Sequence, residues 1–123
     1  MTRPLKFRAR HHVAGNWHYG FLVERNGKTF IFEQDGGQLR EYQVDPKTVS
    51  QFTGLTDKNG KEIYEGDIVR NNDENWEILY DDGAWRMREL KKYHNNPLFL
   101  NEEMYSEVIG NIHENADLLK EAL

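Results

Sequence analysis

The sequence predicts a mainly β protein built from antiparallel hairpins. Segments in which apolar and polar residues alternate recur along the chain, and a period of two is that of a strand with one buried face. Asn-Gly and Asp-Gly pairs, which favour tight turns between strands, separate several of these segments. Fifteen aromatic residues supply large buried areas although the apolar fraction is only 37 %.

The length of 123 residues predicts one domain. Within it we expect an N-terminal β half over about residues 1–52, a turn-rich region over 53–69 and a C-terminal β half over 70–123. Charged residues make up 30 % of the chain and are interspersed, which favours a folded, soluble domain over a disordered one.

The formal charge of −5 argues against a sequence-independent nucleic-acid binder, because phosphate neutralisation drives that kind of binding. The chain has no cysteine, which excludes disulfides, thiolate zinc sites, iron–sulfur clusters and cysteine nucleophiles. We find neither the apolar core of a secretory signal nor a run approaching 18 apolar residues. We therefore expect a cytoplasmic protein without a membrane partner.

Cations and apolar residues alternate over residues 5–10, where the cations are Lys6, Arg8 and Arg10. One interpretation is a basic strand edge that contacts phosphates. The other is a solvated outer face, or a set of charges that discourages edge-to-edge strand pairing.

The clearest hairpin turns at Asn26-Gly27, a type I′ signal. This turn pairs Val23 with Phe30, Leu22 with Ile31, and Phe21 with Phe32. One face is then an aromatic layer of Trp17, Tyr19, Phe21, Val23, Phe30 and Phe32. Such a layer could stack nucleic-acid bases, but its size in a small domain predicts the core, so that Phe21→Ala is expected to cost roughly 3–5 kcal/mol.

The stretch Asp57-Lys58-Asn59-Gly60 allows two turns. A type I′ turn on Asn59-Gly60 sets Lys58 opposite Lys61, a like-charge pair. A type I turn with Gly60 in the bulge position sets Asp57 near Lys61 instead, and it also places Asp at a favoured position. We therefore expect the second turn.

A further turn over residues 64–67 delivers Ile68-Val69 to a strand, and Asp67 is expected to cap it. Gly-Asp-Ile-Val often opens small SH3-like barrels. The fold expected is thus a compact antiparallel sheet or small SH3-like barrel.

A second hairpin turns at Asp82-Gly83. Its register places two apolar pairs on one side, Tyr80 with Trp85 and Ile78 with Met87, and an opposite-charge pair on the other, Glu77 with Arg88. Two arginines of this hairpin then point away from the core, with two lysines just beyond: Arg86, Arg88, Lys91 and Lys92.

Residues 105–113 are predicted to form a last strand, and Asn115 to cap a short helix. Its apolar side would hold Leu118, Leu119, Ala122 and Leu123. A helix of about eight residues is unstable alone and must dock on the sheet or on another subunit.

Residues 6–9, 52–55, 57–69 and 108–112, followed by 114–115 and 118–119, together resemble the signature of the YopX family, small proteins of bacteriophages and bacterial prophages. The resemblance implies a setting but no activity and no catalytic residue. We interpret the signature positions as turns and core: Gly54, Asp57, Asn59, Gly60, Gly66, Asp67, Gly110 and Asn111.

The sequence holds no phosphate-binding glycine loop, no dinucleotide fingerprint and no common metal spacing among its five histidines. We expect no cofactor, no metal and no catalytic site. The first functional hypothesis is a non-enzymatic interaction module that binds a phage or host protein or associates with itself.

The second hypothesis is nucleic-acid binding through the basic positions Lys6, Arg8, Arg10, Arg86, Arg88, Lys91 and Lys92. The third is a hydrolase that uses scattered carboxylates.

Overall fold

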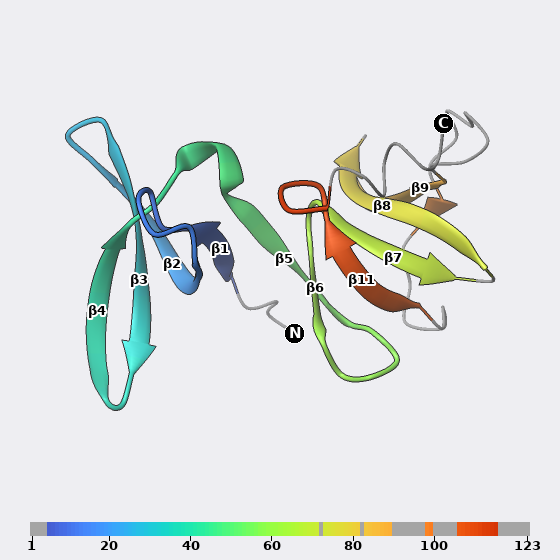
Figure 1. Ribbon diagram of the computed structural model, residues 1–123, viewed down its shortest axis with the longest axis horizontal. Helices are drawn as coiled ribbons and strands as arrows, with labels where there is room; N and C mark the ends of the chain where they lie inside the picture. The colour runs from blue at the N-terminus through green and yellow to red at the C-terminus, as the bar shows by residue number, and fades with distance from the viewer. Residues whose placement is uncertain (1–4, 72, 82, 90–97, 100–105, 116–123) are drawn as a thin grey trace. The chain divides into compact units, whose positions relative to one another are not determined.

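The computed structural model describes residues 5–71, 73–81, 83–89, 98–99 and 106–115 (Figure 1). It confirms a mainly β protein made of two antiparallel sheets. The chain divides into two compact units, Met1–Phe52 and Thr53–Leu123. The expected single domain over 1–123 stays a prediction. No helix among the described residues is long and apolar enough to cross a membrane.

The first sheet has the strand order β4-β3-β2-β1-β5-β6. Its elements in chain order are β1 (Phe7–Arg10), β2 (Trp17–Arg25), β3 (Lys28–Asp35), β4 (Gln38–Gln43), the 3₁₀ helix η1 (Pro46–Thr48), β5 (Ser50–Thr56) and β6 (Glu62–Tyr64). The second sheet has the order β10-β9-β8-β7-β11. Its strands are β7 (Asp67–Asn71), β8 (Glu74–Asp81), β9 (Ala84–Glu89), β10 (Leu98–Phe99) and β11 (Glu107–Asn111).

The β2–β3 hairpin has the predicted register, in which Val23 pairs with Phe30 and Phe21 with Phe32. Both turn residues have positive φ, 54° at Asn26 and 75° at Gly27, as a type I′ turn requires. The turn chemistry and the alternation were therefore sufficient to determine this hairpin.

The prediction that the aromatic layer forms the core is wrong. Phe21 is 59 % exposed, whereas Ile31, on the opposite face of the same hairpin, is fully buried. The core of the first unit consists of Ala9, Ile31 and Val44, with Phe7, Leu22 and Val49 packed against them.

The curvature of the sheet explains why this face is inside. In a flat sheet β1 and β4 would lie three strand spacings, about 14 Å, apart. Instead His11 forms a bridge with Val44, and the Asp45 N–H donates to the Arg10 carbonyl over 2.8 Å. The sheet therefore curls around Ile31, and the aromatic layer lies on its outer side.

This curl is not a closed barrel. Beyond β1 the contact consists of one bridge and a few backbone hydrogen bonds, and no closed barrel is found among the described residues. The expectation of a small SH3-like barrel is therefore corrected to two open antiparallel sheets. The basic strand β1 is also not an edge, because β2 and β5 flank it.

The structure confirms the predicted register of the β8–β9 hairpin in the second unit. Tyr80 pairs with Trp85, Ile78 with Met87, and Glu77 with Arg88. The charged pair forms an ion pair of 2.8 Å. The core lies on the other face and consists of Ile63, Val69, Ile78 and Met87, with Trp76, Trp85 and Val108 packed against them.

Asp57 joins the β5–β6 turn to β11. One carboxylate oxygen accepts hydrogen bonds from the N–H groups of Asn59 (2.8 Å) and Lys61 (2.9 Å). The other accepts from the Val108 N–H over 3.0 Å. Burial alone would raise the pKa of Asp57, but these backbone donors and the charge of Lys61 outweigh it and hold the pKa below its ordinary value.

The turn itself is the predicted type I turn with a glycine bulge. The Gly60 N–H donates to the Asp57 carbonyl over 3.0 Å, and the Asp57 N–H donates to the Lys61 carbonyl over 2.8 Å. Gly60 has φ 82° and an open space where a Cβ would lie. Its requirement for glycine is thus conformational rather than steric.

Other signature residues also close turns. The Asp67 carboxylate accepts from the Tyr64 N–H over 2.8 Å, so it caps the turn as expected. The Asn111 side-chain oxygen accepts from the N–H groups of His113 and Glu114. A Cβ at Gly110 would lie 2.5 Å from the Asn115 side-chain oxygen. The helix predicted beyond Asn115 lies outside the described residues.

Replacing Gly60 by valine should destabilise the protein by about 1–2 kcal/mol or more, because a β-branched residue resists positive φ. Thermal unfolding of Gly60→Val measures the loss, and Gly60→Asn, which tolerates this conformation, is the matched control. An unchanged melting temperature for Gly60→Val would contradict the turn assignment.

Replacing Asp57 by asparagine should cost about 1–3 kcal/mol at neutral pH, because an amide cannot accept through both of its atoms and leaves the part-buried Val108 N–H without this acceptor. Since the folded pKa is depressed, the ionised carboxylate stabilises the fold above its unfolded pKa of about 3.9. That contribution is lost as the pH falls through the lower folded pKa.

Urea unfolding of the natural chain and of Asp57→Asn across this acid range measures the effect. The stability difference should shrink as the pH falls below about 3.9. A difference that stays constant with pH would show that the carboxylate charge is not what stabilises the turn.

Candidate functional site

The outer face of the first unit combines a row of cations with rows of rings. The pairing of Arg8 with Tyr19 and of Arg10 with Trp17 places the β1 cations beside the β2 rings. The pairing of Phe21 with Phe32 adds the β3 rings. We call this surface the outer face; its members are Lys6, Arg8, Arg10, Trp17, Tyr19, Phe21, Phe30, Phe32 and Phe52.

Cations cover part of these rings. The Arg8 guanidinium lies 4.6 Å from the centre of the Trp17 ring, and the Lys6 ammonium lies 5.6 Å from that of Phe52. Arg8 is only 5 % exposed, so the expectation of a solvated basic face is wrong at this residue. These contacts use the charges to cover rings of the same unit.

A groove of about 460 Å³ lies beside the more exposed rings of the outer face, Tyr19 and Phe21. Two exposed apolar side chains border it, Phe21 (59 % exposed) and Leu5 (68 %), together with the partly exposed ring of Tyr19. Its complete lining is Leu5, Lys6, Tyr19, Gly20, Phe21, Phe32, Glu33 and Gln34. The volume is that of a small-ligand or peptide side-chain pocket.

Gly20 lines the groove at a point where β2 and β3 approach each other closely. A Cβ at this position would lie 2.1 Å from the Phe32 carbonyl oxygen, so no other residue fits without moving a strand. The absence of a side chain at Gly20 therefore allows the two strands to approach there.

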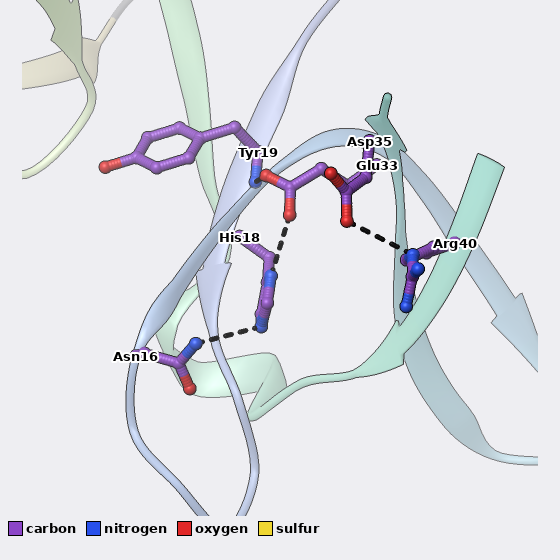
Figure 2. Close-up of polar contacts among 6 residues, drawn as sticks. All are labelled: Asn16, His18, Tyr19, Glu33, Asp35 and Arg40. Carbon is purple, nitrogen blue, oxygen red and sulfur yellow. Dashed lines mark hydrogen bonds and ion pairs between the residues drawn. The ribbon is translucent and has the colours of Figure 1, made fainter. Parts of the chain in front are cut away.

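Glu33 holds the polar wall of the groove in place (Figure 2). One of its oxygens lies 2.8 Å from His18 Nδ1, and the other accepts from the Tyr19 N–H over 3.0 Å. The Asn16 amide nitrogen lies 3.3 Å from His18 Nε2. If that amide donates, His18 is the tautomer with its proton on Nδ1, directed at Glu33.

His18 also stacks on Tyr42, with ring centres 3.7 Å apart. Since both imidazole nitrogens have partners and the side chain is buried, His18 serves here to position Glu33 and the backbone of Tyr19. A rigid wall of this kind favours a pre-organised groove.

The structure places the predicted basic positions in two separate groups. On β1, Arg10 donates from its Nε to the Gly15 carbonyl over 2.8 Å. On β9, Arg86 donates from its Nε to the Asp81 carbonyl over 3.0 Å, and Arg88 pairs with Glu77. Lys91 and Lys92 lie outside the described residues.

The two units differ in charge. Residues 1–52 hold eight Lys and Arg against five Asp and Glu, a net +3, whereas residues 53–123 hold eight against sixteen, a net −8. The total of −5 conceals this difference. A count for each half of the sequence would have revealed it.

Sequence reasoning found the aromatic layer but missed the groove. Alternation assigns residues 17–23 to two faces, yet it does not say which face is outside. Glu33 and Gly20 carried no functional signal in the sequence. Among the described residues, no group of three or more His, Cys, Asp or Glu side chains is placed to hold a metal ion.

The described residues thus define a mainly β protein with an exposed aromatic groove. The family model described as YopX protein matches residues 6–120. The chain belongs to the YopX family.

A similar solved structure is the crystal structure of protein EF1440 from Enterococcus faecalis. It is 25 % identical, with a TM-score of 0.61, and the alignment covers 96 % of this chain and 99 % of that one. The comparison with curated proteins found no match. The comparisons name no activity, substrate or partner.

Truncating one side chain on each face of the β2–β3 hairpin should show which face is buried, because the two losses of stability should differ. Ile31→Ala should cost about 2–5 kcal/mol, because it opens a cavity in the core. Phe21→Ala should cost less than about 1 kcal/mol, because the ring is mostly exposed. Denaturant unfolding of both variants measures this, and equal losses would mean that the outer face is also core.

Proposed function

We propose that the protein is a non-enzymatic interaction module that binds apolar side chains of a protein partner in the groove of its outer face. The observation that carries the proposal is the exposure of Phe21 and Leu5 beside that groove. Large apolar side chains exposed together on a folded protein indicate an interaction site. From the family setting, we place this binding in the cytoplasm of a bacterial host, with a phage or host protein as partner.

The distribution of cations favours a protein partner over a nucleic acid. The Arg8 side chain is buried against Trp17, and Arg10 is bound to a backbone carbonyl of its own unit. A phosphate backbone would have to compete with these contacts. The groove offers mainly apolar surface, which suits the side chains of a peptide.

Nucleic-acid binding is the second candidate, because one observation favours it. The first unit carries a net +3, and its outer face holds rings at alternate positions of β2 beside the cations of β1. Rings on a sheet with flanking cations are a common platform for single-stranded nucleic acid.

Selection from a displayed peptide library against the full chain tests the first candidate. Selected peptides should be rich in apolar residues, and Phe21→Ser should weaken their binding, measured by fluorescence anisotropy, at least about tenfold. Val13→Ser is the matched control, because Val13 is an exposed apolar residue of the same unit that does not line the groove.

The second candidate is measured in parallel with a labelled oligothymidine at about 50 mM salt, where phosphate contacts are strong. Oligothymidine binding that depends on Phe21, without peptide binding, would overturn the first candidate. Peptide binding that Phe21→Ser leaves unchanged would place the contact elsewhere.

A further inference from the structure

Glu33 is the one acid among the residues that line the groove, and its carboxylate keeps unused acceptor capacity. One oxygen contacts His18 and the other accepts from the Tyr19 N–H. Each carboxylate oxygen has two lone pairs, so each oxygen of Glu33 has room for one further hydrogen bond. In the tautomer in which the Asn16 amide donates to His18, the imidazole is neutral, and Glu33 keeps its negative charge.

The cations nearest to Glu33 in the sheet make their contacts elsewhere. The register pairs Glu33 with Arg40, but Arg40 forms its ion pair with Asp35 over 3.1 Å (Figure 2). Lys6 also lines the groove, yet its ammonium lies over the Phe52 ring on β5, and β1 and β2 separate β5 from β3 in the strand order. Among the described residues, no lysine or arginine forms an ion pair with Glu33.

The outer face shows which cation suits its rings. The Arg8 guanidinium lies 4.6 Å from the centre of the Trp17 ring, and the Arg25 guanidinium lies 4.7 Å from that of Phe30. Phe21, which is mostly exposed in the groove, has no such cation over it in the described part of the chain. A planar guanidinium stacks on ring faces and also offers two donors to one carboxylate.

We propose that the groove binds an arginine side chain of the partner segment, with the guanidinium at the Glu33 carboxylate and against the rings of Tyr19 and Phe21. The inference rests on the proposed function and names a residue that the apolar segment of the partner must carry. An apolar side chain next to this arginine packs against Leu5, on the apolar surface of the groove.

Charge complementarity within the groove selects this occupant over a purely apolar one. The Glu33 side chain is 25 % exposed, so a peptide that covers the groove removes water from its carboxylate. Desolvating a carboxylate without giving it a partner is costly. An arginine supplies donors and an opposite charge to Glu33 while its apolar stem and planar head cover ring surface.

The peptides selected from the displayed library test this inference. Those whose binding is weakened by Phe21→Ser should share an arginine next to apolar residues. Citrulline has nearly the shape of arginine but no charge. Replacing the arginine of one such peptide by citrulline should therefore weaken its binding to the natural chain, measured by fluorescence anisotropy, at least about tenfold.

Glu33→Gln shows whether this loss depends on the carboxylate. Glutamine keeps the length of the side chain and an acceptor for the Tyr19 N–H but removes the charge, so the two peptides should bind this variant within about twofold of each other. Glu24→Gln makes the same chemical change at an exposed residue of the same unit that does not line the groove, and it should keep the tenfold preference.

Phe21→Leu is a second variant, which keeps apolar surface but removes the ring. It should lower the preference for the arginine peptide about two- to fivefold. Urea unfolding checks that each variant is folded, and Phe21→Leu does not alter the contacts of Glu33 with His18 and Tyr19, so it tests the inference even if Glu33→Gln unfolds.

Peptides that bind through Phe21 but lack arginine would overturn the inference and leave the proposed function in place. A preference for arginine that neither Glu33→Gln nor Phe21→Leu lowers would overturn it too, because the guanidinium then lies elsewhere. A preference that Glu24→Gln lowers as much as Glu33→Gln would assign the effect to the total charge of the unit and would also overturn it. The proposed function fails on a different result, namely when no selected peptide depends on Phe21.

Discussion

The curl of the first sheet is the constraint on which the candidate site depends. Contacts between the end of β1 and the residues after β4, including the bridge of His11 with Val44, bring together strands that a flat sheet would keep about 14 Å apart. The concave side then encloses a small core of Ala9, Ile31 and Val44. The aromatic residues Phe21 and Phe32 lie on the convex side, where they line the groove.

The residues of the outer face have two roles: some stabilise the unit, and others line the groove that we propose as a binding site. Arg8 covers Trp17, and Lys6 lies over Phe52, so these charges stabilise rings that would otherwise be more exposed. Phe21 lies beyond them at the groove. In the sequence, the basic strand suggested contacts with phosphates. In the structure its charges cover rings of the same unit, and the exposed ring of Phe21 is the basis for proposing an apolar partner.

The signature of the YopX family has a structural rather than a chemical purpose at the positions described. Asp57 joins a turn to β11 through three backbone donors, and Asp67 caps the turn before β7. Gly60 supplies a backbone conformation that other residues resist. Asp57, Gly60 and Asp67 belong to the second unit, whereas the groove is lined by residues of the first.

The sequence by itself determined the local structure: the turns at Asn26-Gly27 and Gly60, and the registers of the β2–β3 and β8–β9 hairpins. These follow from backbone preferences and from contacts between residues close in the chain. Only the tertiary structure decided which face of β2 and β3 is buried, because that depends on contacts between β1 and the end of β4, more than thirty residues apart. Alternation divides a strand into two faces, and the more apolar face is not always the inner one.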